Sequence, residues 1–308
     1  MRICLMIEGQ EGVTWDEWRA LAEACEQHGL EGLVRSDHYG SLLAPGRGSL
    51  DAWATLSGLA AVTSRIRLGT MVSPATFRHP SELAKVVATA DHVSGGRVEL
   101  GLGAGWNEAE HRSYGFPFPE LSERLERFTA QLEIVHRSWT EDEFDFAGRY
   151  YRLEGCRALP KPLQQPHPPL IVGGGAKRGT LEPAARFADE YNTPFVGPEG
   201  CRRRKQHWDE ACEHVGRGPL PFSVMTGLIV GSDRTELVEH ARRTLGRMNR
   251  EGDDVEAFIE ERGASTVVGT VEEVRERLAE YEDAGVERIM LQHLDHSDLD
   301  TVALLGSL

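Results

Sequence analysis

Cysteines and long apolar runs are scarce in this 308-residue sequence. The five cysteines form no C-x-x-C pair, which excludes a zinc ribbon and argues against a disulfide framework. No apolar run approaches the roughly 18 residues of a membrane span, and the chain opens directly on an apolar segment with no signal peptide. The sequence therefore predicts a cytoplasmic protein that is stable without disulfide bonds.

Net positive charge is also lacking, because 49 acidic residues oppose 34 basic ones and the formal net charge is −15. Nucleic acids and anionic membranes are bound by basic faces, so we expect neither as a partner. An anionic ligand would have to be held by local donors. Arginine outnumbers lysine 30 to 4, a bias common in bacteria with GC-rich genomes.

The motifs of several enzyme classes are missing. The sequence has no H-E-x-x-H, no G-x-S-x-G and no carboxylate-rich loop, so neither a metal site nor triad hydrolysis is predicted. It also lacks the G-x-x-x-x-G-K-[ST] loop that binds nucleotide triphosphates. A small-molecule substrate handled without a metal is the remaining expectation.

Short apolar segments alternate with helix-like segments along almost the whole chain. Thr14 with Glu17 three residues later predicts a capping box at the start of the first helix, and Gly29 predicts its end. The predicted strands cover residues 3–7, 32–36, 66–72, 97–102, 170–172, 190–193, 222–230 and 288–291. Such an α/β alternation predicts a (β/α)8 TIM barrel, with a doubly wound parallel sheet as the alternative.

Two stretches interrupt this alternation. Residues 141–169 are aromatic and then proline-rich, and residues 250–265 show no periodicity. We expect a single domain over residues 1–308, with a small hairpin around residues 144–151 in the first insertion and an irregular loop in the second. Residues 141–157 and 250–264 of these stretches, together with the loop at residues 41–49, are the candidates for setting substrate preference.

Three consecutive glycines follow the fifth predicted strand. Gly173, Gly174 and Gly175 free the backbone to aim successive N–H groups at one point, and the start of a helix follows. This arrangement suits a phosphate group. The side chains that would add charge and a hydroxyl donor are Lys177, Arg178 and Thr180. The alternative is a flexible turn with solvated basic residues.

Polar residues also follow the second and fourth predicted strands. Asp37 and His38 are adjacent, so their side chains need not point the same way, and the imidazole is either a proton donor or a structural residue. Gly103 and Gly105 precede Asn107 but do not match G-x-G-x-x-G. They allow the backbone either to approach a flat ring or to make room for a neighbouring helix.

Taken in order, these segments resemble the bacterial luciferase-like superfamily, in particular its coenzyme F420-dependent oxidoreductases. The resemblance rests on residues 35–39, 68–74, 77–80, 101–108, 168–175, 188–189 and 269–274. It implies a TIM barrel with insertions, a homodimer, and hydride transfer between F420, a deazaflavin, and an organic substrate.

The resemblance also implies roles for individual residues. It implies a cis peptide bond between Met71 and Val72, and a role for His38 in protonating the substrate or steadying the anionic reduced ring. The residues that it places against the deazaflavin ring are Asp37, Thr70, Met71, Val72 and Asn107, and those that it places at the phosphate are Gly173, Gly174, Gly175 and Ala176.

Two positions depart from relatives of known activity. Leu42 stands where the sugar-phosphate and alcohol dehydrogenases have a tryptophan, and Trp106 stands where the sugar-phosphate enzymes have a glutamate. These changes favour a reductase acting on an enone, an imine or a similar acceptor. The alternatives are an FMN-dependent monooxygenase on the same barrel and a non-catalytic barrel that binds a flavin or deazaflavin; the arginine-rich composition favours F420.

Overall fold

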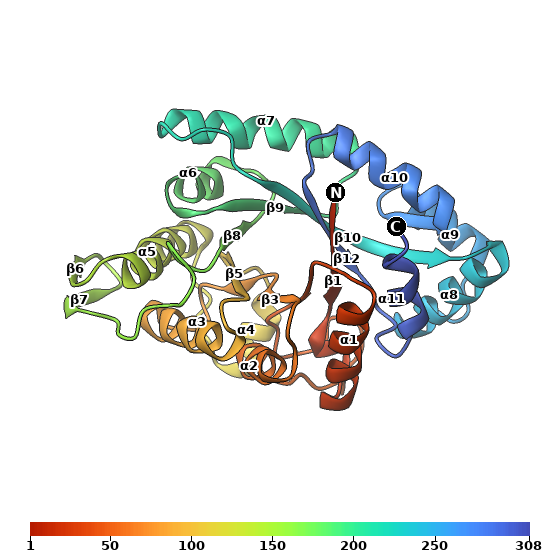
Figure 1. Cartoon of the computed structure of the whole chain (residues 1–308), viewed down its shortest axis with the longest axis horizontal. Coiled ribbons are helices and arrows are strands. Elements are labelled where there is room, and N and C mark those ends of the chain that lie inside the picture. The colour runs from red at the N-terminus through yellow and green to blue at the C-terminus, as the bar shows by residue number, and fades with distance from the viewer.

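A closed barrel of parallel strands forms the centre of the computed structural model, which describes residues 1–308 (Figure 1). The ring closes because β9 pairs with β10 and β12 pairs with β1. The barrel strands are β1 (Arg2–Ile7), β2 (Gly32–Arg35), β3 (Arg67–Thr70), β5 (Val98–Gly103), β8 (Leu170–Gly173), β9 (Glu190–Pro194), β10 (Phe222–Gly231) and β12 (Arg288–Gln292). All the predicted strands are confirmed, and closure of the ring excludes the doubly wound sheet.

Helices surround the strands on all sides of this ring (Figure 1). Those that follow the barrel strands are α1 (Trp15–Gln27), α2 (Ala52–Val62), α3 (Pro80–Ser94), α5 (Leu121–Thr140), α6 (Arg178–Phe187), α7 (Pro198–His214), α8 (Arg234–Arg247) and α11 (Leu299–Leu305). The predicted capping box of Thr14 and Glu17 begins α1, and Gly29 follows the helix with a φ of +75°.

The first interrupting stretch contains the predicted hairpin, with a longer second strand than expected. Strand β6 (Phe144–Ala147) pairs antiparallel with β7 (Arg152–Cys156) at the edge of the molecule beside α5 (Figure 1). Phe144 and Tyr151 pack against Ile134 of α5. No residue of this hairpin lines the central cavity described below, so its predicted role in substrate preference has no support from its position.

The prediction of an irregular loop at residues 250–265 is wrong. Asp254 caps a helix, α9 (Val255–Gly263), by accepting the amide of Ala257 at 2.9 Å. A short strand, β11 (Val267–Thr270), and a helix, α10 (Val271–Asp283), follow. Strand β11 pairs with the last residues of β10, which is ten residues long and therefore extends beyond the barrel. The helix was missed because its nine residues are too few for a clear apolar period.

The two largest apolar clusters form separate layers. The larger one lies between the strands and the helices, and the smaller one fills the barrel axis with Cys4, Met6, Val34, Met71, Ile171, Met225 and Met290. A charged layer of Glu99, Glu190 and Arg288 also lies buried inside the barrel. Besides α9 and β11, three further short elements were not predicted, namely the 3-10 turn η1 (Gly9–Glu11), β4 (Ser73–Pro74) and α4 (Glu108–Tyr114).

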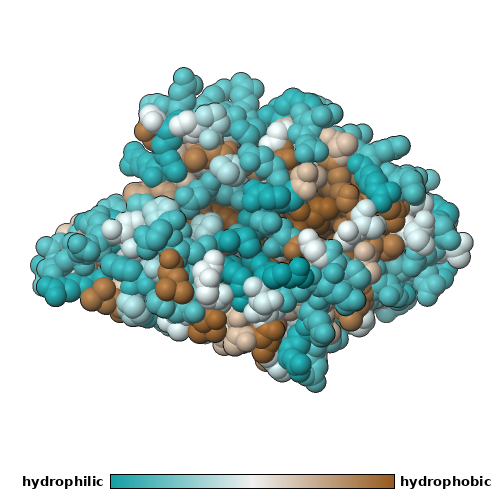
Figure 2. Space-filling view, in the orientation of Figure 1, coloured by the Kyte–Doolittle hydropathy of each residue, from teal (hydrophilic) through white to brown (hydrophobic).

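The outer surface is largely hydrophilic, with apolar residues in separate patches on the face shown (Figure 2). No helix has both the length and the hydrophobicity of a membrane-spanning segment.

Candidate active site

A cavity of about 710 Å³ opens at the carboxyl ends of the barrel strands. This is the end at which TIM barrels gather their binding groups. Each barrel strand or the loop after it contributes to the wall; examples in barrel order are Glu8, His38, Met71, Gly103, Gly173, Asn192, Met225 and Gln292. The predicted concentration of site residues at these strand ends therefore matches the position of the cavity.

His38 is held in the cavity wall by a carboxylate that sequence reasoning missed. Its Nδ1 lies 2.7 Å from Oε2 of Glu110 on α4, and the Glu110 side chain is 2% exposed. The other Glu110 oxygen accepts the amide N–H groups of Tyr39 and Gly40. Burial opposes protonation of His38, but the hydrogen bond and charge of Glu110 outweigh it and raise the pKa of the imidazole above its ordinary value. Because Glu110 takes Nδ1, Nε2 is left for the cavity.

Asp37 points away from His38, as its neighbouring position allowed. Its buried carboxylate accepts hydrogen bonds from Ser73 Oγ at 2.6 Å and from Arg78 Nη1 at 2.5 Å. Asp37 does not line the cavity. Its visible role is to tie the end of β2 to the segment after β3, behind the wall on which a ring would lie.

Two of the four other residues expected against the ring line the cavity. Met71 and Val72 do so, and the peptide bond between them is cis, as the resemblance implied. Thr70 is buried and donates to a carbonyl of β5 at 2.9 Å. Asn107 is the N-cap of α4 and accepts the amide of Glu110 at 3.3 Å. Thr70 and Asn107 therefore support the wall, and Asn107 does so by starting the helix that carries Glu110.

The triple glycine lies on the cavity at the end of β8. A Cβ on Gly173 would lie 2.7 Å from Val72 Cγ1, and one on Gly174 would lie 2.8 Å from the Tyr191 hydroxyl. A Cβ on Gly175 would meet nothing within 4 Å. The first two glycines are thus required by close packing, while Gly175 is open to a ligand.

Free amide groups follow these glycines. The N–H groups of Gly175 and Lys177 donate to no backbone carbonyl, and α6 begins directly after them, at Arg178. The first turn of a helix also presents unpaired N–H groups and a partial positive charge. The Arg178 side chain is exposed and pairs with Glu182 at 2.7 Å. The free donors of this loop are therefore backbone amides more than basic side chains.

Tyr191 of β9 hydrogen-bonds to the loop that follows β8, and the sequence did not predict this role. Its hydroxyl accepts the Ala176 amide at 3.1 Å and lies 2.8 Å from Thr180 Oγ1. Thr180 in turn donates to the carbonyl of Lys177 at 3.0 Å. Ala176 has a φ of +54°, a conformation that a non-glycine residue needs local support to keep. Tyr191 therefore holds the free amides of the loop in place.

Replacing Tyr191 with phenylalanine is expected to weaken phosphate-dependent binding of the cofactor about tenfold, because one neutral hydrogen bond contributes roughly 1 kcal/mol and its loss leaves a buried amide unpaired. Isothermal titration calorimetry with whichever of F420 and FMN the wild type binds measures the change in affinity. Tyr281→Phe is the matched control, because its hydroxyl also donates within the fold, to the Val196 carbonyl at 3.1 Å, but away from the loop. Equal affinities for the Tyr191 variant and the wild type would contradict this role.

The two positions that depart from the dehydrogenases both line the cavity. Leu42 gives the wall an apolar surface at the position where those enzymes have a tryptophan. Trp106 packs edge-on against His38, with ring centroids 5.7 Å apart and an interplanar angle of 80°. The imidazole thus has an aromatic neighbour from the loop after β5, and Glu110 supplies the nearby carboxylate from one helical turn further along the chain.

The end of β1 supplies two carboxylates that sequence reasoning passed over. Glu8 lines the cavity and accepts hydrogen bonds from Gln10 at 2.7 Å and Gln292 at 2.5 Å. Glu11 accepts the amide of Leu42 at 2.8 Å and pairs with Arg47 at 3.0 Å, so it fixes the loop after β2. The polar residues that follow the first predicted strand were the sequence feature that could have indicated these two carboxylates.

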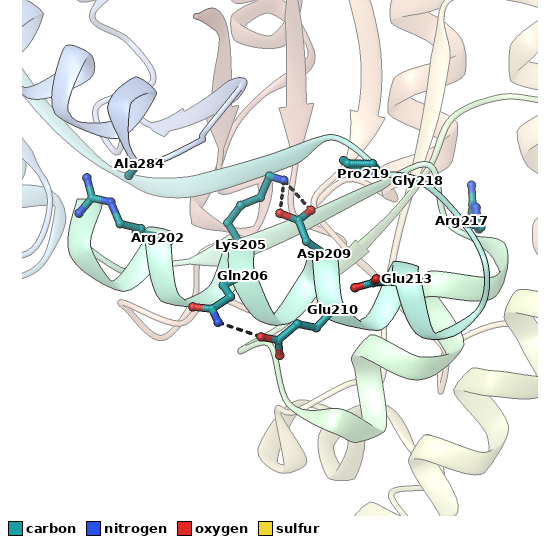
Figure 3. A pocket seen from close by; sticks show the side chains of 10 residues that line it. All are labelled: Arg202, Lys205, Gln206, Asp209, Glu210, Glu213, Arg217, Gly218, Pro219 and Ala284. Carbon is teal, nitrogen blue, oxygen red and sulfur yellow. Dashed lines mark hydrogen bonds and ion pairs between the residues drawn. The ribbon is translucent and has the colours of Figure 1, made fainter.

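A second hollow runs along the outside of α7 (Figure 3). Its charges pair along the helix, with Lys205 2.6 Å from Asp209 and Gln206 2.8 Å from Glu210. Its other lining residues precede β10 and β12, at the amino ends of barrel strands. Because it lies at the end of the barrel where TIM barrels do not place catalysis, it is not a candidate active site.

The chain belongs to the family described as luciferase-like monooxygenase, which matches residues 2–288. An uncharacterized protein of Mycobacterium bovis is 39% identical over 218 residues, 69% of this chain and 74% of that protein. An F420-dependent glucose-6-phosphate dehydrogenase of Segniliparus rotundus is 33% identical over 58% of this chain and 51% of its own length. An FMNH2-dependent dimethylsulfone monooxygenase of Pseudomonas putida is 31% identical over 63% and 53%.

Solved structures agree with the fold. A secondary alcohol dehydrogenase, F420-dependent and solved with an F420-acetone adduct, has a TM-score of 0.83 at 18% identity and covers 99% of this chain and 97% of its own. The monooxygenase RslO1 of Streptomyces bottropensis has a TM-score of 0.81 at 24% identity and covers 100% and 98%. The relatives include both F420-dependent and FMN-dependent enzymes, so family membership leaves both cofactors open.

Proposed function

We propose that the protein is an oxidoreductase that transfers a hydride between coenzyme F420 and a small organic substrate, as a reductase or dehydrogenase. The His38–Glu110 pair carries this proposal. Adding a hydride to a carbonyl, imine or enone places negative charge on the substrate, and a proton must neutralise it. His38 is the single imidazole in the cavity lining, and Glu110 raises its pKa, which favours the protonated form that a proton donor needs.

The cavity fits a cofactor of the flavin type at both of its ends. Its volume of about 710 Å³ lies in the usual range for ligand sites. The apolar surface of Met71 and Val72 suits a flat ring, and the free amides of Gly175 and Lys177 suit a phosphate. When bound, a deazaflavin supplies a carbon that exchanges a hydride without reacting readily with oxygen.

The residues of this chain would then act on the substrate. His38 Nε2 would deliver a proton to the substrate oxygen or nitrogen, while Nδ1 stays hydrogen-bonded to Glu110. The Glu110 carboxylate stabilises the charged imidazole and fixes its orientation. In the oxidation direction, the neutral imidazole would accept the same proton.

FMN-dependent monooxygenation is the second candidate. The 31% identity with the dimethylsulfone monooxygenase favours it, since a phosphate loop serves either cofactor. The composition and the origin of the relatives support F420. Arginine outnumbers lysine 30 to 4, as is common in GC-rich bacteria, and the 39% identical relative is mycobacterial.

Titration of the purified protein with F420 and, separately, with FMN distinguishes the candidates. We expect F420 to bind with quenching or a shift of its fluorescence and FMN to bind more weakly. Tight FMN binding without F420 binding would overturn the proposal. A panel of enone, imine and ketone acceptors then tests turnover, and tight cofactor binding with no turnover on any acceptor would favour a non-catalytic barrel.

A further inference from the structure

Arg262 is the single arginine or lysine among the residues that line the cavity. It lies in the last turn of α9, a helix that sequence reasoning took for an irregular loop. Its Nε is buried and has no hydrogen-bond partner, and the guanidinium takes part in none of the ion pairs of the chain. An arginine held inside a protein normally has a carboxylate or several acceptors to offset its loss of hydration.

A glycine on the inner face of β10 makes room for this guanidinium. A Cβ on Gly227 would lie 2.6 Å from Arg262 Nη2. Side chains alternate along a strand, so Gly227 faces the same way as Met225, which lines the cavity. The guanidinium of this partly buried side chain therefore lies over the inner face of the barrel wall, at the cavity. The missing side chain at Gly227 thus leaves the space that the Arg262 guanidinium occupies.

The rest of the cavity offers Arg262 little compensating charge from the protein. Glu11 is already paired with Arg47. Glu8 is held by Gln10 and Gln292 at the end of β1. Burial is the largest influence on the pKa of Arg262 and lowers it; the adjacent Glu261 carboxylate opposes this, but burial and the nearby charge of Arg250 together outweigh it. A negative charge brought in by a ligand would relieve both effects.

The position of Arg262 in the barrel separates it from the expected cofactor contacts. Around the ring of strands, β10 lies opposite β3, after which Met71 and Val72 form the surface expected to receive the cofactor ring. The phosphate loop follows β8, two places from β10. A ring lying on Met71 and Val72 would therefore have its other face, and the substrate, towards the Arg262 side.

We propose that Arg262 is the recognition residue for an anionic group on the substrate, such as a carboxylate or sulfonate. Planar guanidinium groups bind such anions through paired N–H donors. The nearby apolar lining, which includes Leu42, Leu43, Met248, Phe195 and Leu294, would receive the rest of the molecule. The substrate class is thus an organic anion with an apolar body. This assignment rests on the proposed function only in calling the ligand a substrate.

Binding of cinnamate and of its neutral analogue cinnamamide tests the proposal. Calorimetry is done on the purified chain alone and again after saturation with F420 or FMN. We expect wild-type protein to bind cinnamate about 10- to 100-fold more tightly than cinnamamide, the usual contribution of a charge-assisted hydrogen bond. The Arg262→Met variant should bind the two probes equally, and Arg262→Lys should keep part of the preference.

Two further variants make the result specific. Gly227→Ala keeps the charge of Arg262 but displaces the guanidinium, so it should reduce the preference for cinnamate. Arg203→Met removes an exposed arginine that pairs with Glu199 on α7, and it should leave the preference unchanged. Circular dichroism and thermal melting confirm that each variant is folded.

Two outcomes would overturn the assignment. One is equal binding of cinnamate and cinnamamide by wild-type protein, and the other is an Arg262→Met variant that loses cofactor affinity while keeping the preference for cinnamate. Failure of the proposed function looks different. If neither F420 nor FMN binds, the preference for cinnamate can still be measured on the chain alone.

Discussion

Replacing Arg288 with methionine is expected to lower the free energy of unfolding by about 3–5 kcal/mol, the cost of removing one partner of a buried ion pair. Arg288 is buried inside the barrel, with Nη2 2.6 Å from Glu99 and Nη1 3.3 Å from Glu190. Its removal leaves two buried carboxylates, of which only Glu99 has another cation, Arg67. Urea denaturation at pH 7, followed by circular dichroism, measures the change.

The loss of stability in this variant should shrink as the pH falls. Burial raises the pKa of Glu190 even beside Arg288, and the loss of that cation would raise the pKa of both carboxyl groups. A carboxyl group with a folded-state pKa above its unfolded value stabilises the fold when protonated, and this contribution is lost as the pH rises through the folded pKa. The variant should therefore be least stable at neutral and alkaline pH.

Two comparisons isolate the buried charges. Adding Glu190→Gln to the Arg288→Met variant should recover part of the stability, since it removes one uncompensated charge. Arg203→Met, which breaks an exposed pair with Glu199 on α7, should change the free energy of unfolding by less than about 0.5 kcal/mol. Arg288→Met protein as stable as the wild type at pH 7 would show that this charged layer contributes nothing.

The barrel could be predicted because parallel strands are buried on both faces and appear as short continuous apolar runs. The same rule could not find β11, because Val267–Thr270 packs on the part of β10 that extends beyond the barrel. It also could not find the charged layer. Arg288 and Glu99 are 189 residues apart, and nothing local to either of them indicates that they meet inside the barrel.

The candidate site could be predicted as a set of strand ends, but not as a set of side-chain directions. Asp37 and His38 are neighbours, yet one binds Arg78 behind the wall and the other lines the cavity. The partner of His38 is 72 residues away. Glu110 lies on a seven-residue helix too short for its apolar pattern to be recognised. Arg262 was missed for the same reason, because it lies on α9, another short helix.

The other large expected effect concerns His38. We expect His38→Gln to lower kcat about 10²- to 10⁴-fold, the usual contribution of a general acid, with cofactor affinity unchanged. Kinetics with an acceptor that the wild type turns over measure this loss. His207→Gln, on the exposed outer face of α7, is the matched control and should keep wild-type kcat. A His38→Gln variant with near wild-type kcat would leave the imidazole a structural role only.

Glu110→Gln separates the positioning of His38 from its chemistry. The amide oxygen of the new side chain can still accept the N–H groups of Tyr39 and Gly40, but it no longer supplies a negative charge beside the imidazole. The pKa of His38 should therefore fall, because its present elevation comes from Glu110 acting against burial. A general acid is lost as the pH rises through its pKa, so the alkaline limb of the pH–rate profile should move to lower pH. Nitrogen-detected NMR titration of the imidazole checks the same shift without substrate. A lower kcat at all pH values, with an unchanged His38 titration, would mean that Glu110 only fixes the loop that contains Tyr39 and Gly40.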